Sequence, residues 1–256
     1  MKAIIIGAGR GRRMMPETRD LPKCMLAGFD GRRVLDWILD ALRAAGIDEI
    51  VFVGGFRMNA IRKAYPDLRF IRNSLWRHNN ILESLMCASE DLDRPIVVSY
   101  SDILYEADVV KRLVATDADV ALATDPDWRR RYTGRSLHPE GEAEKTAVSG
   151  GYVCDIGKHL DAHAVQGEFI GLSYFSARAA VEMRLRYVAL KNSARNSPFH
   201  SSRSLRQAYL TDMIKELIES GLKVKPVPVL GMWDELDTPE DVKRVRDRLH
   251  ASAKVR

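Results

Sequence analysis

The stretch "AIIIGAGRGRRMMPETRDLPKCML", residues 3–26, decides how the rest of this 256-residue chain is understood. It opens with a short run of β-branched residues bounded by a glycine, which is typical of a buried strand over Lys2–Ile6. Three glycines alternate with arginines after that run, and a Pro-Lys pair follows at Pro22 and Lys23. A flexible backbone, fixed positive charges and a lysine, all just after one strand, suit the binding of a polyphosphate.

Two common phosphate-binding loops do not fit this stretch. A dinucleotide-binding loop needs G-x-G-x-x-G, but the sixth residue is Arg12 when counted from Gly7 and Met14 when counted from Gly9. A P-loop needs a second glycine, followed by lysine, where Arg12 stands. The stretch therefore matches neither of these two loops.

What remains is the pattern G-x-G-x-R at Gly9, Gly11 and Arg13, with Lys23 beyond it. Glycines allow backbone N–H groups to approach phosphate oxygens closely. Arg13 can bind a phosphate with its planar fork, and Lys23 can bind one as a point charge. The alternative is a tight strand-to-helix turn that carries surface arginines.

Strands and helices alternate along the first half of the chain. Short apolar runs predict strands over Lys2–Ile6, 49–55, 69–73 and 94–105. Helical spacing of apolar residues predicts helices over 34–42 and 79–92. This alternation predicts an α/β, Rossmann-like, mixed and mostly parallel sheet with helices on both faces. Ligands bind such sheets beyond the carboxyl ends of the strands, where the glycine loop, Gly54–Gly55 and Ser101–Asp102 all fall.

The second half is less regular and predicts a small antiparallel substrate-binding subregion. Expected strands cover 119–125, 144–158 and 168–175, and expected helices cover 177–192 and 204–221. Thr238-Pro239-Glu240-Asp241 has the composition of a helix start. We expect one domain over 1–256, with a nucleotide-binding half at about 1–115, an acceptor-binding half at about 116–237 and a C-terminal helix at 238–256.

Composition excludes several classes of protein. Hydrophobic residues make up 46% of the chain, which is enough for a sizeable core, and no apolar run approaches the ~20 residues of a membrane span. A net charge of +5 makes the chain mildly basic, but it carries no nucleic-acid-binding module. Cys24, Cys87 and Cys154 are scattered, as expected for reduced thiols with packing roles. We expect a cytoplasmic protein without a signal peptide, nucleic-acid partner or membrane insertion, and a homodimer is left open.

The stretch 8–26 resembles the signature of nucleotidyltransferases that join a nucleoside triphosphate to a phosphorylated small molecule. The stretches 73–85, 125–145, 167–176 and 233–241 resemble one branch of that family, the bacterial phosphocholine cytidylyltransferases and their phosphonate-specific relatives. The resemblance covers nearly the whole chain. Two departures stand out: Gly7-Ala8 replaces a pair of alanines, a change that we expect to be benign, and Glu235 stands where sugar-nucleotide relatives carry an aspartate.

The reaction implied by this resemblance joins CTP to a small phosphate monoester or phosphonate, such as phosphocholine or 2-aminoethylphosphonate, and releases pyrophosphate. It also implies magnesium, held by Asp102 at a strand end and by Glu235 and Asp237. Two alternatives stay open, namely a sugar-1-phosphate nucleotidyltransferase and a noncatalytic nucleotide sensor on the same fold.

The resemblance also implies roles for single residues. The backbone of Ala8, Gly9, Gly11 and Gly55 would approach the nucleotide, and Asn80 and Ser84 would contact cytosine or ribose. The catalytic cations would be Arg13, Lys23 and Lys145.

Aromatic and charged residues in the second half are candidates for binding the acceptor. A quaternary ammonium is held by aromatic faces and nearby carboxylates, which Trp128, Tyr132 and Tyr174 together with Glu144 and Glu168 could supply. Arg135 would suit a more acidic phosphonate. We expect Trp128 to line the acceptor pocket.

Overall fold

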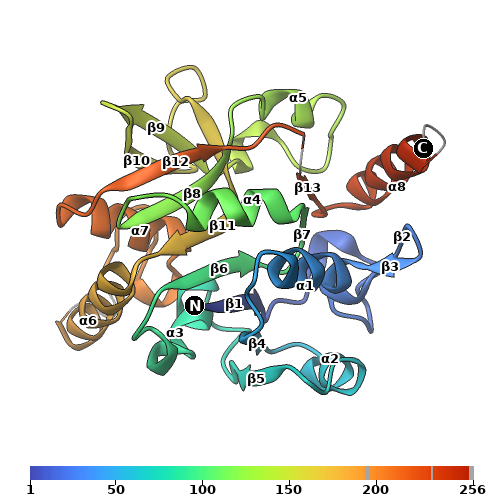
Figure 1. Ribbon diagram of the computed structural model, residues 1–256, viewed down its shortest axis with the longest axis horizontal. Coiled ribbons are helices and arrows are strands. Elements are labelled where there is room, and N and C mark those ends of the chain that lie inside the picture. Colours follow the sequence, from blue (N-terminus) through green and yellow to red (C-terminus); the bar gives the residue numbers. More distant parts are fainter. Residues whose placement is uncertain (194–196, 232, 254–256) are drawn as a thin grey trace.

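The computed structural model describes residues 1–193, 197–231 and 233–253 (Figure 1). The strands are β1 (Lys2–Gly7), β2 (Ala27–Phe29), β3 (Arg32–Arg33), β4 (Ile50–Gly54), β5 (Arg69–Arg72), β6 (Ile96–Tyr100), β7 (Ile103–Tyr105), β8 (Val120–Asp125), β9 (Lys145–Ser149), β10 (Tyr152–Gly157), β11 (Gly167–Phe175), β12 (Val224–Pro228) and β13 (Trp233–Glu235). The α-helices are α1 (Val34–Ala44), α2 (Met58–Ala64), α3 (Ile81–Met86), α4 (Ala107–Val114), α5 (Arg129–Tyr132), α6 (Ala177–Ser193), α7 (Leu210–Glu219) and α8 (Pro239–Ala253).

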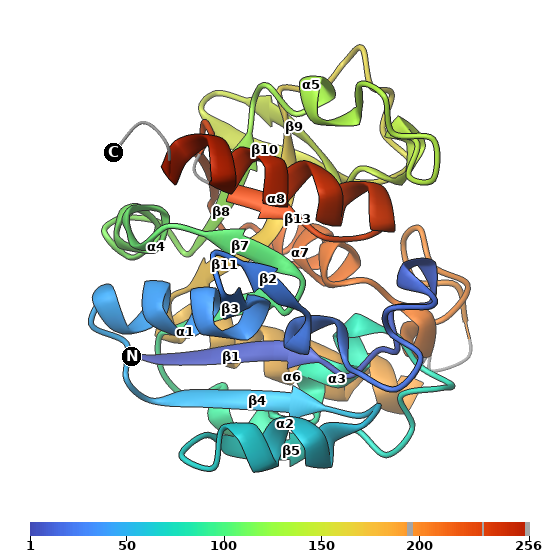
Figure 2. The ribbon, with the colours of Figure 1, turned by 90° about the vertical axis from the view of Figure 1, so that its right-hand side faces the viewer.

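The central sheet is mixed, with the order β10-β9-β11-β6-β1-β4-β5, and β8 and β12 extend it from β11. Strands β6, β1, β4 and β5 run parallel, and β1 and β4 lie side by side in Figure 2. Strand β11 runs antiparallel to β6, β8 and β9, and β9 forms a hairpin with β10. This is the Rossmann-like α/β sheet with an antiparallel subregion that the sequence predicts.

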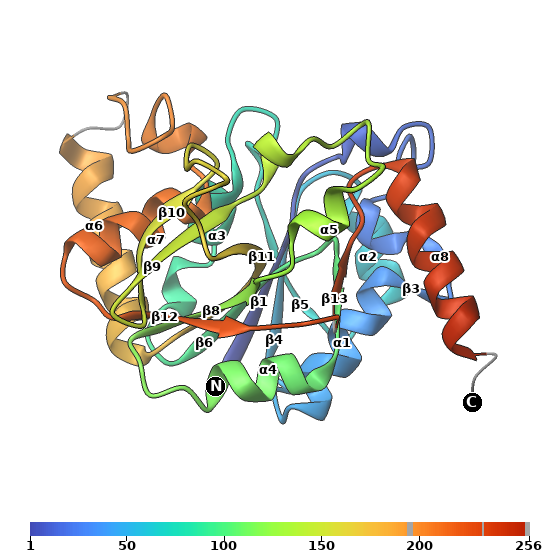
Figure 3. The same ribbon diagram turned by 90° about the horizontal axis from the view of Figure 1, so that it is seen from above.

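Alternating side chains of β1 bury two separate hydrophobic layers. Ala3 and Ile5 belong to a cluster on the side of α1 and α4, and Ile4 and Ile6 belong to a cluster on the side of α3, α6 and α7. Figure 3 shows these helices on opposite sides of the strands. A strand buried on both faces needs a continuous apolar run, and "AIII" supplies it.

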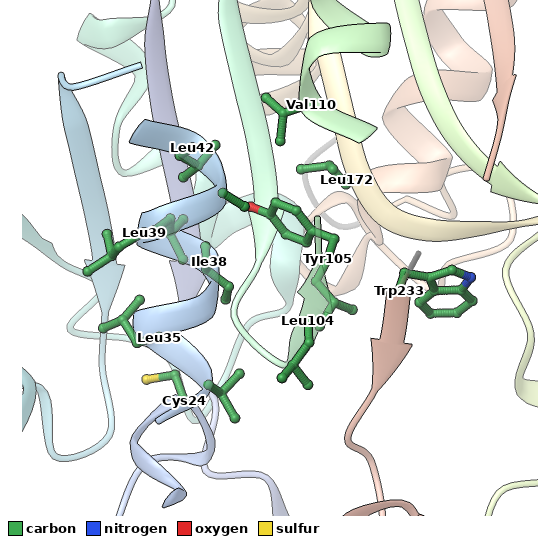
Figure 4. Close-up of a cluster of buried hydrophobic side chains, with 14 of the residues drawn as sticks. Cys24, Leu35, Ile38, Leu39, Leu42, Leu104, Tyr105, Val110, Leu172 and Trp233 are labelled. Carbon is green, nitrogen blue, oxygen red and sulfur yellow. The ribbon is translucent and has the colours of Figure 1, made fainter. Parts of the chain in front are cut away.

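A short second sheet, β7 with β13, joins the C-terminal segment to the main sheet. Figure 4 shows Tyr105 of β7 between Leu42 of α1 and Leu172 of β11. Leu104 and Trp233 are also buried in this cluster. This packing fixes where the chain enters α8.

Several elements differ from the expectation. The strand expected over 94–105 breaks at Ser101–Asp102 into β6 and β7, and the helix expected over 79–92 contains only α3 and a short 3₁₀ turn at Ser89–Asp91. Cys24 is buried as expected, but Cys87 and Cys154 are exposed, so the packing role expected for those two is wrong. Within the described ranges, no helix combines the length and apolar composition needed to cross a membrane.

Candidate active site

The loop after β1 is shaped by its glycines. Gly11 has φ of 68°, and a Cβ there would lie 3.2 Å from Cε of Lys23, so the glycine suits both the turn and the approach of that lysine. A Cβ at Gly7 would lie 2.4 Å from Cζ of Phe52. The glycine that replaces an alanine at the end of β1 therefore makes room for an aromatic ring of β4.

Two adjoining cavities lie at the carboxyl ends of the strands, beside this loop. The larger has a volume of about 430 Å³ and the smaller about 200 Å³. Both are lined by Gly9, Gly11, Lys23, Asn80, Ile81, Tyr100 and Asp102. The glycine loop thus borders a continuous space with a small and a large compartment.

Lys23 lies at the centre of this space and contacts two carboxylates. Its Nζ donates hydrogen bonds to Oδ2 of Asp102 at 2.9 Å and to Oδ1 of Asp237 at 2.7 Å. Burial would lower the pKa of Lys23, but the charges of Asp102 and Asp237 outweigh it and raise that pKa. The lysine is therefore held as a cation between the two acids.

The pairing of β7 with β13 brings the proposed metal-binding acids together. Glu235 pairs with Ile103, the residue after Asp102, and the Leu236 N–H donates to the Asp102 carbonyl at 3.0 Å. Burial and the neighbouring charge of Asp237 raise the pKa of Glu235 well above its ordinary value. The break after β6 is what allows β13 to reach this position.

Asp237 contacts the side chains of Arg13 and His138 in addition to that of Lys23. Oδ2 of Asp237 lies 2.8 Å from a guanidinium nitrogen of Arg13 and 2.8 Å from Nδ1 of His138. Burial would raise the pKa of Asp237, but Lys23, His138 and Arg13 hold it well below its usual range. This carboxylate is therefore ionised at neutral pH.

The start of α8 orients Asp237. Oδ2 of the buried Asp241 accepts hydrogen bonds from the backbone N–H groups of Asp237 at 3.0 Å and Thr238 at 2.8 Å. A guanidinium nitrogen of Arg135 donates to the same oxygen at 2.9 Å. The predicted helix start is confirmed, and its capping acid also fixes the site.

The residues present fit a divalent cation. Ligand atoms of His138, Glu235 and Asp237 lie within 4.8 Å of one another, and Asp102 is joined to Asp237 through the Lys23 ammonium. Carboxylate oxygens are the ligands that Mg²⁺ prefers. The Lys23 ammonium already lies between the carboxylates of Asp102 and Asp237.

The smaller cavity has a fixed polar wall. Asn73 donates hydrogen bonds to Oδ1 of Asn79 and to Oγ of Ser84, both at 2.9 Å. Ser84 is buried and lines this cavity with Asn80 and Trp76. An aromatic ring beside amides and a hydroxyl suits a small planar heterocycle.

The far end of the larger cavity carries carboxyl groups instead. Burial raises the pKa of Glu144 to about 7 and that of Glu168 to about 8. Glu144 accepts a hydrogen bond from the Tyr100 hydroxyl at 3.1 Å, and Glu168 accepts one from the Tyr132 hydroxyl. The raised pKa values mean that nearby cations do not fully offset the effect of burial on these two carboxyl groups. A cationic group bound at this end of the cavity could pair with them.

Some residues predicted for the site lie outside the lining of both cavities. Lys145 is buried, and its ammonium donates to the backbone carbonyl of Lys158 at 2.7 Å. Gly55 lines a separate surface depression and not the nucleotide cavity. Neither residue faces the space beside Lys23.

The aromatic residues expected around the acceptor also lie outside the lining of both cavities. Trp128 and Tyr132 pack against each other and Ala143 in a small buried cluster, with ring centroids of the first two 5.6 Å apart. The expectation that Trp128 lines the acceptor pocket is corrected, because its ring is enclosed by this cluster. Arg135 binds the acids Glu235 and Asp241, and Tyr174 packs against the core.

Sequence reasoning missed several residues of the larger cavity, among them Tyr100, His138, Lys158 and Tyr209. His138 follows no motif, and Lys158 and Tyr209 come from segments far apart in the chain, with the Lys158 ammonium 4.8 Å from the Tyr209 ring centroid. The one available indication was that His138 lies inside the stretch 125–145, which resembles the phosphocholine cytidylyltransferases.

Known proteins are similar to this chain over most of its length. The model of the MobA-like NTP transferase domain matches residues 3–216. The CTP:phosphoglutamine cytidylyltransferase of Campylobacter jejuni is 30% identical over 254 residues, which cover 95% of this chain and 98% of the relative. The 2-aminoethylphosphonate cytidylyltransferase of Lancefieldella rimae is 27% identical over 203 residues, covering 77% of this chain and 76% of the relative.

The fold is also that of a solved structure. The CTP:phosphocholine cytidylyltransferase of Streptococcus pneumoniae superimposes with a TM-score of 0.70 at 20% identity, over 97% of this chain and 98% of that one.

Proposed function

We propose that this chain is a CTP-dependent cytidylyltransferase. The proposal proceeds from the family, since the chain belongs to the MobA-like NTP transferases and is a nucleotidyltransferase. Its acceptor would be a small phosphate monoester or phosphonate that carries an ammonium group. The observation that supports this most is the continuous space from the glycine loop, past Lys23, to the carboxyl groups of Glu144 and Glu168.

In this reaction an acceptor oxygen attacks the α-phosphorus of CTP. A new P–O bond forms, the bond to the β-phosphate oxygen breaks, and pyrophosphate leaves with the electron pair of that bond. The chemistry needs alignment and charge neutralisation more than a base, because a phosphate monoester, whose second pKa is about 6, is largely dianionic at neutral pH. A strong general base is therefore not required.

Each part of the cavity has a role in that reaction. The backbone of Gly9 and Gly11 and the side chains of Arg13 and Lys23 would bind the triphosphate. A magnesium ion held by Asp102, Glu235 and Asp237 would neutralise charge on the phosphates. His138 and Arg13 hold Asp237 in place.

The smaller cavity would take the pyrimidine. Its volume of about 200 Å³ is modest, and Ser84, Asn79 and Asn80 supply hydrogen-bonding groups beside Trp76. A rigid amide network discriminates bases by leaving a buried polar group unpaired when the wrong base enters.

The acceptor end favours a cationic substituent. Glu144 and Glu168 are carboxyl groups that an ammonium would ionise and pair with, and the acceptors named in the Campylobacter and Lancefieldella relatives, phosphoglutamine and 2-aminoethylphosphonate, both carry an amine. Glucose 1-phosphate carries no such group, which weighs against a neutral sugar 1-phosphate as the acceptor.

The test is a pyrophosphate-release screen of four nucleoside triphosphates against phosphocholine, 2-aminoethylphosphonate, phosphoglutamine and glucose 1-phosphate. We expect release with CTP and one of the three amine-derived acceptors. Release only with UTP and glucose 1-phosphate would favour a sugar nucleotidyltransferase, and no release with any pair would favour the sensor.

A further inference from the structure

A third depression, of about 480 Å³, adjoins the glycine loop but shares only Trp76 with the smaller cavity and no residue with the larger one. It is lined by Arg10, Arg19, Asp20, Gly55, Phe56, Arg57, Trp76 and Arg77. Four arginines thus surround one hollow with a single acid. None of these arginines has a role in the proposed reaction.

The charges in this depression, hereafter the arginine depression, are poorly neutralised. Arg57 pairs with Asp20 at 2.7 Å, with both side chains more than half exposed. Among the described residues, no carboxylate lies within 4.0 Å of Arg10, Arg19 or Arg77. Clustered cations around a concave surface focus a positive potential that attracts anions.

Arg10 has an unused hydrogen-bond donor. Its Nε atom is buried and has no partner among the described residues, and a terminal nitrogen makes only a 3.4 Å contact with the Arg19 carbonyl. An arginine donor without a partner costs free energy unless a ligand accepts from it.

Two aromatic rings hold the guanidinium groups beside the depression. The Arg10 guanidinium lies 5.3 Å from the Phe56 ring centroid, and that of Arg77 lies 5.0 Å from the Trp76 ring centroid. The rings themselves pack edge to face at 5.7 Å. Such contacts restrict the arginines while leaving their N–H groups available, which suits bidentate binding of phosphate.

We propose that the arginine depression is a second anion site, which binds an oligophosphate separately from the nucleotide cavity. Pyrophosphate and the phosphate chain of a nucleotide share the required chemistry. A small anion is favoured over a nucleic-acid strand because the arginines converge on one hollow, whereas a strand needs charges along an extended groove.

The arginine depression is mechanically joined to the glycine loop. The Phe56 N–H donates to the Ala8 carbonyl at 2.9 Å, and a Cβ at Gly55 would lie 2.7 Å from that carbonyl and 2.6 Å from Cγ of Trp76. Arg10 itself stands between Gly9 and Gly11. An anion bound by Arg10 would therefore bias the loop that borders the nucleotide cavity.

Isothermal titration of the 256-residue chain with inorganic pyrophosphate, without divalent metal, tests this site. The variant Arg19→Gln/Arg77→Gln removes two exposed charges from the arginine depression, and Lys111→Gln/Arg112→Gln removes two exposed charges from α4 as the matched control. Lys23→Ala is the third variant, because we expect it to weaken binding in the nucleotide cavity.

We expect the Arg19/Arg77 variant to bind one equivalent of pyrophosphate at least ten-fold more weakly, while the control and Lys23→Ala retain that equivalent. Pyrophosphate binding by the Arg19/Arg77 variant that equals the control would overturn the proposal. A second result would also overturn it, namely that Lys23→Ala binds no pyrophosphate at all while the protein binds a single-stranded RNA oligomer tightly.

Repeating the titration of Lys23→Ala with CTP separates the two sources of the ligand. CTP that binds as tightly as pyrophosphate identifies a nucleotide as the occupant of the arginine depression, and weaker binding of CTP identifies pyrophosphate itself. Both results support the site, provided that the binding is lost when Arg19 and Arg77 are also replaced.

Discussion

The ammonium of Lys23 lies 2.7 Å from Oδ1 of Asp237, although 214 positions separate the two residues in the chain. This contact joins the glycine loop at the start of the chain to the segment that leads into α8. It exists because β13 pairs with β7 and brings Asp237 back to the carboxyl ends of the parallel strands. The two halves of the candidate site are thus assembled by a three-residue strand pair.

Replacing Lys23 or Arg13 by alanine should lower kcat/KM for CTP at least ten-fold, which corresponds to about 1.4 kcal/mol. The physical reason is the loss of a cation beside the triphosphate. Steady-state kinetics measure the effect, and Lys63→Ala, at an exposed position in α2, is the control. Kinetics of both site variants that match this control would remove these cations from triphosphate binding.

The variant Asp102→Asn should lose nearly all turnover while keeping its fold, because it removes a carboxylate charge from the proposed magnesium site without changing the side-chain volume. Turnover at limiting magnesium, together with circular dichroism, measures both parts of this expectation. The exposed Asp117→Asn is the matched control. Near-normal turnover of Asp102→Asn at limiting magnesium would exclude Asp102 as a ligand.

Asp241→Asn should reduce the free energy of unfolding by ~3 kcal/mol, because it removes the charge of a buried carboxylate that pairs with the guanidinium groups of both Arg135 and Arg244. Urea unfolding measures this change, and Asp247→Asn, exposed on the same helix, should stay within ~0.5 kcal/mol of the wild type. Equal effects of the two substitutions would show that the start of α8 does not depend on this cap.

Glu168 should make the protein less stable as the pH rises. Burial raises its pKa to about 8 from an ordinary value of 4.5, so between these pH values the folded state keeps a proton that the unfolded state has released. The free energy of unfolding must therefore fall as the pH rises through this window. The stability that Glu168 contributes is fully present only below 4.5, the pKa of its carboxyl group in the unfolded chain.

Glu168→Gln has no such proton and isolates the effect. The free energy of unfolding of the wild type, minus that of Glu168→Gln, should fall by more than ~1 kcal/mol between pH 5 and pH 8. Urea unfolding at intermediate pH values gives this difference. A difference that stays constant or grows with pH would mean that Glu168 is ionised in the folded protein.

Local patterns made much of the fold predictable. The apolar run at Lys2–Ile6, the helix that ends before Gly46 and the cap at Thr238 each depend on neighbouring residues, and the structure contains all three. The β7–β13 pairing could not be predicted, because a strand of three residues carries no periodic signal and its partner lies more than a hundred residues away.

In the candidate site, too, local patterns were predictable and long-range contacts were not. Arg13 and Lys23 follow from the glycine loop, and Asp102 from its place after a strand. Trp128 was misplaced because a tryptophan in an arginine-rich stretch has no apolar neighbours in sequence, although Tyr132 and Ala143 enclose it in space. His138 was missed because a single histidine in a loop carries no spacing that marks it.

The transfer of label from [α-³²P]CTP to an ammonium-bearing acceptor is the direct test of cytidylyl transfer. With 2-aminoethylphosphonate, phosphocholine or phosphoglutamine present, we expect a new labelled CMP adduct from one of them, formed in equal amount with pyrophosphate. We expect no adduct from labelled UTP or from Asp102→Asn. A wild-type protein that forms no labelled adduct from CTP, or that forms one only from UTP and a sugar phosphate, would show that it is not a cytidylyltransferase for such acceptors.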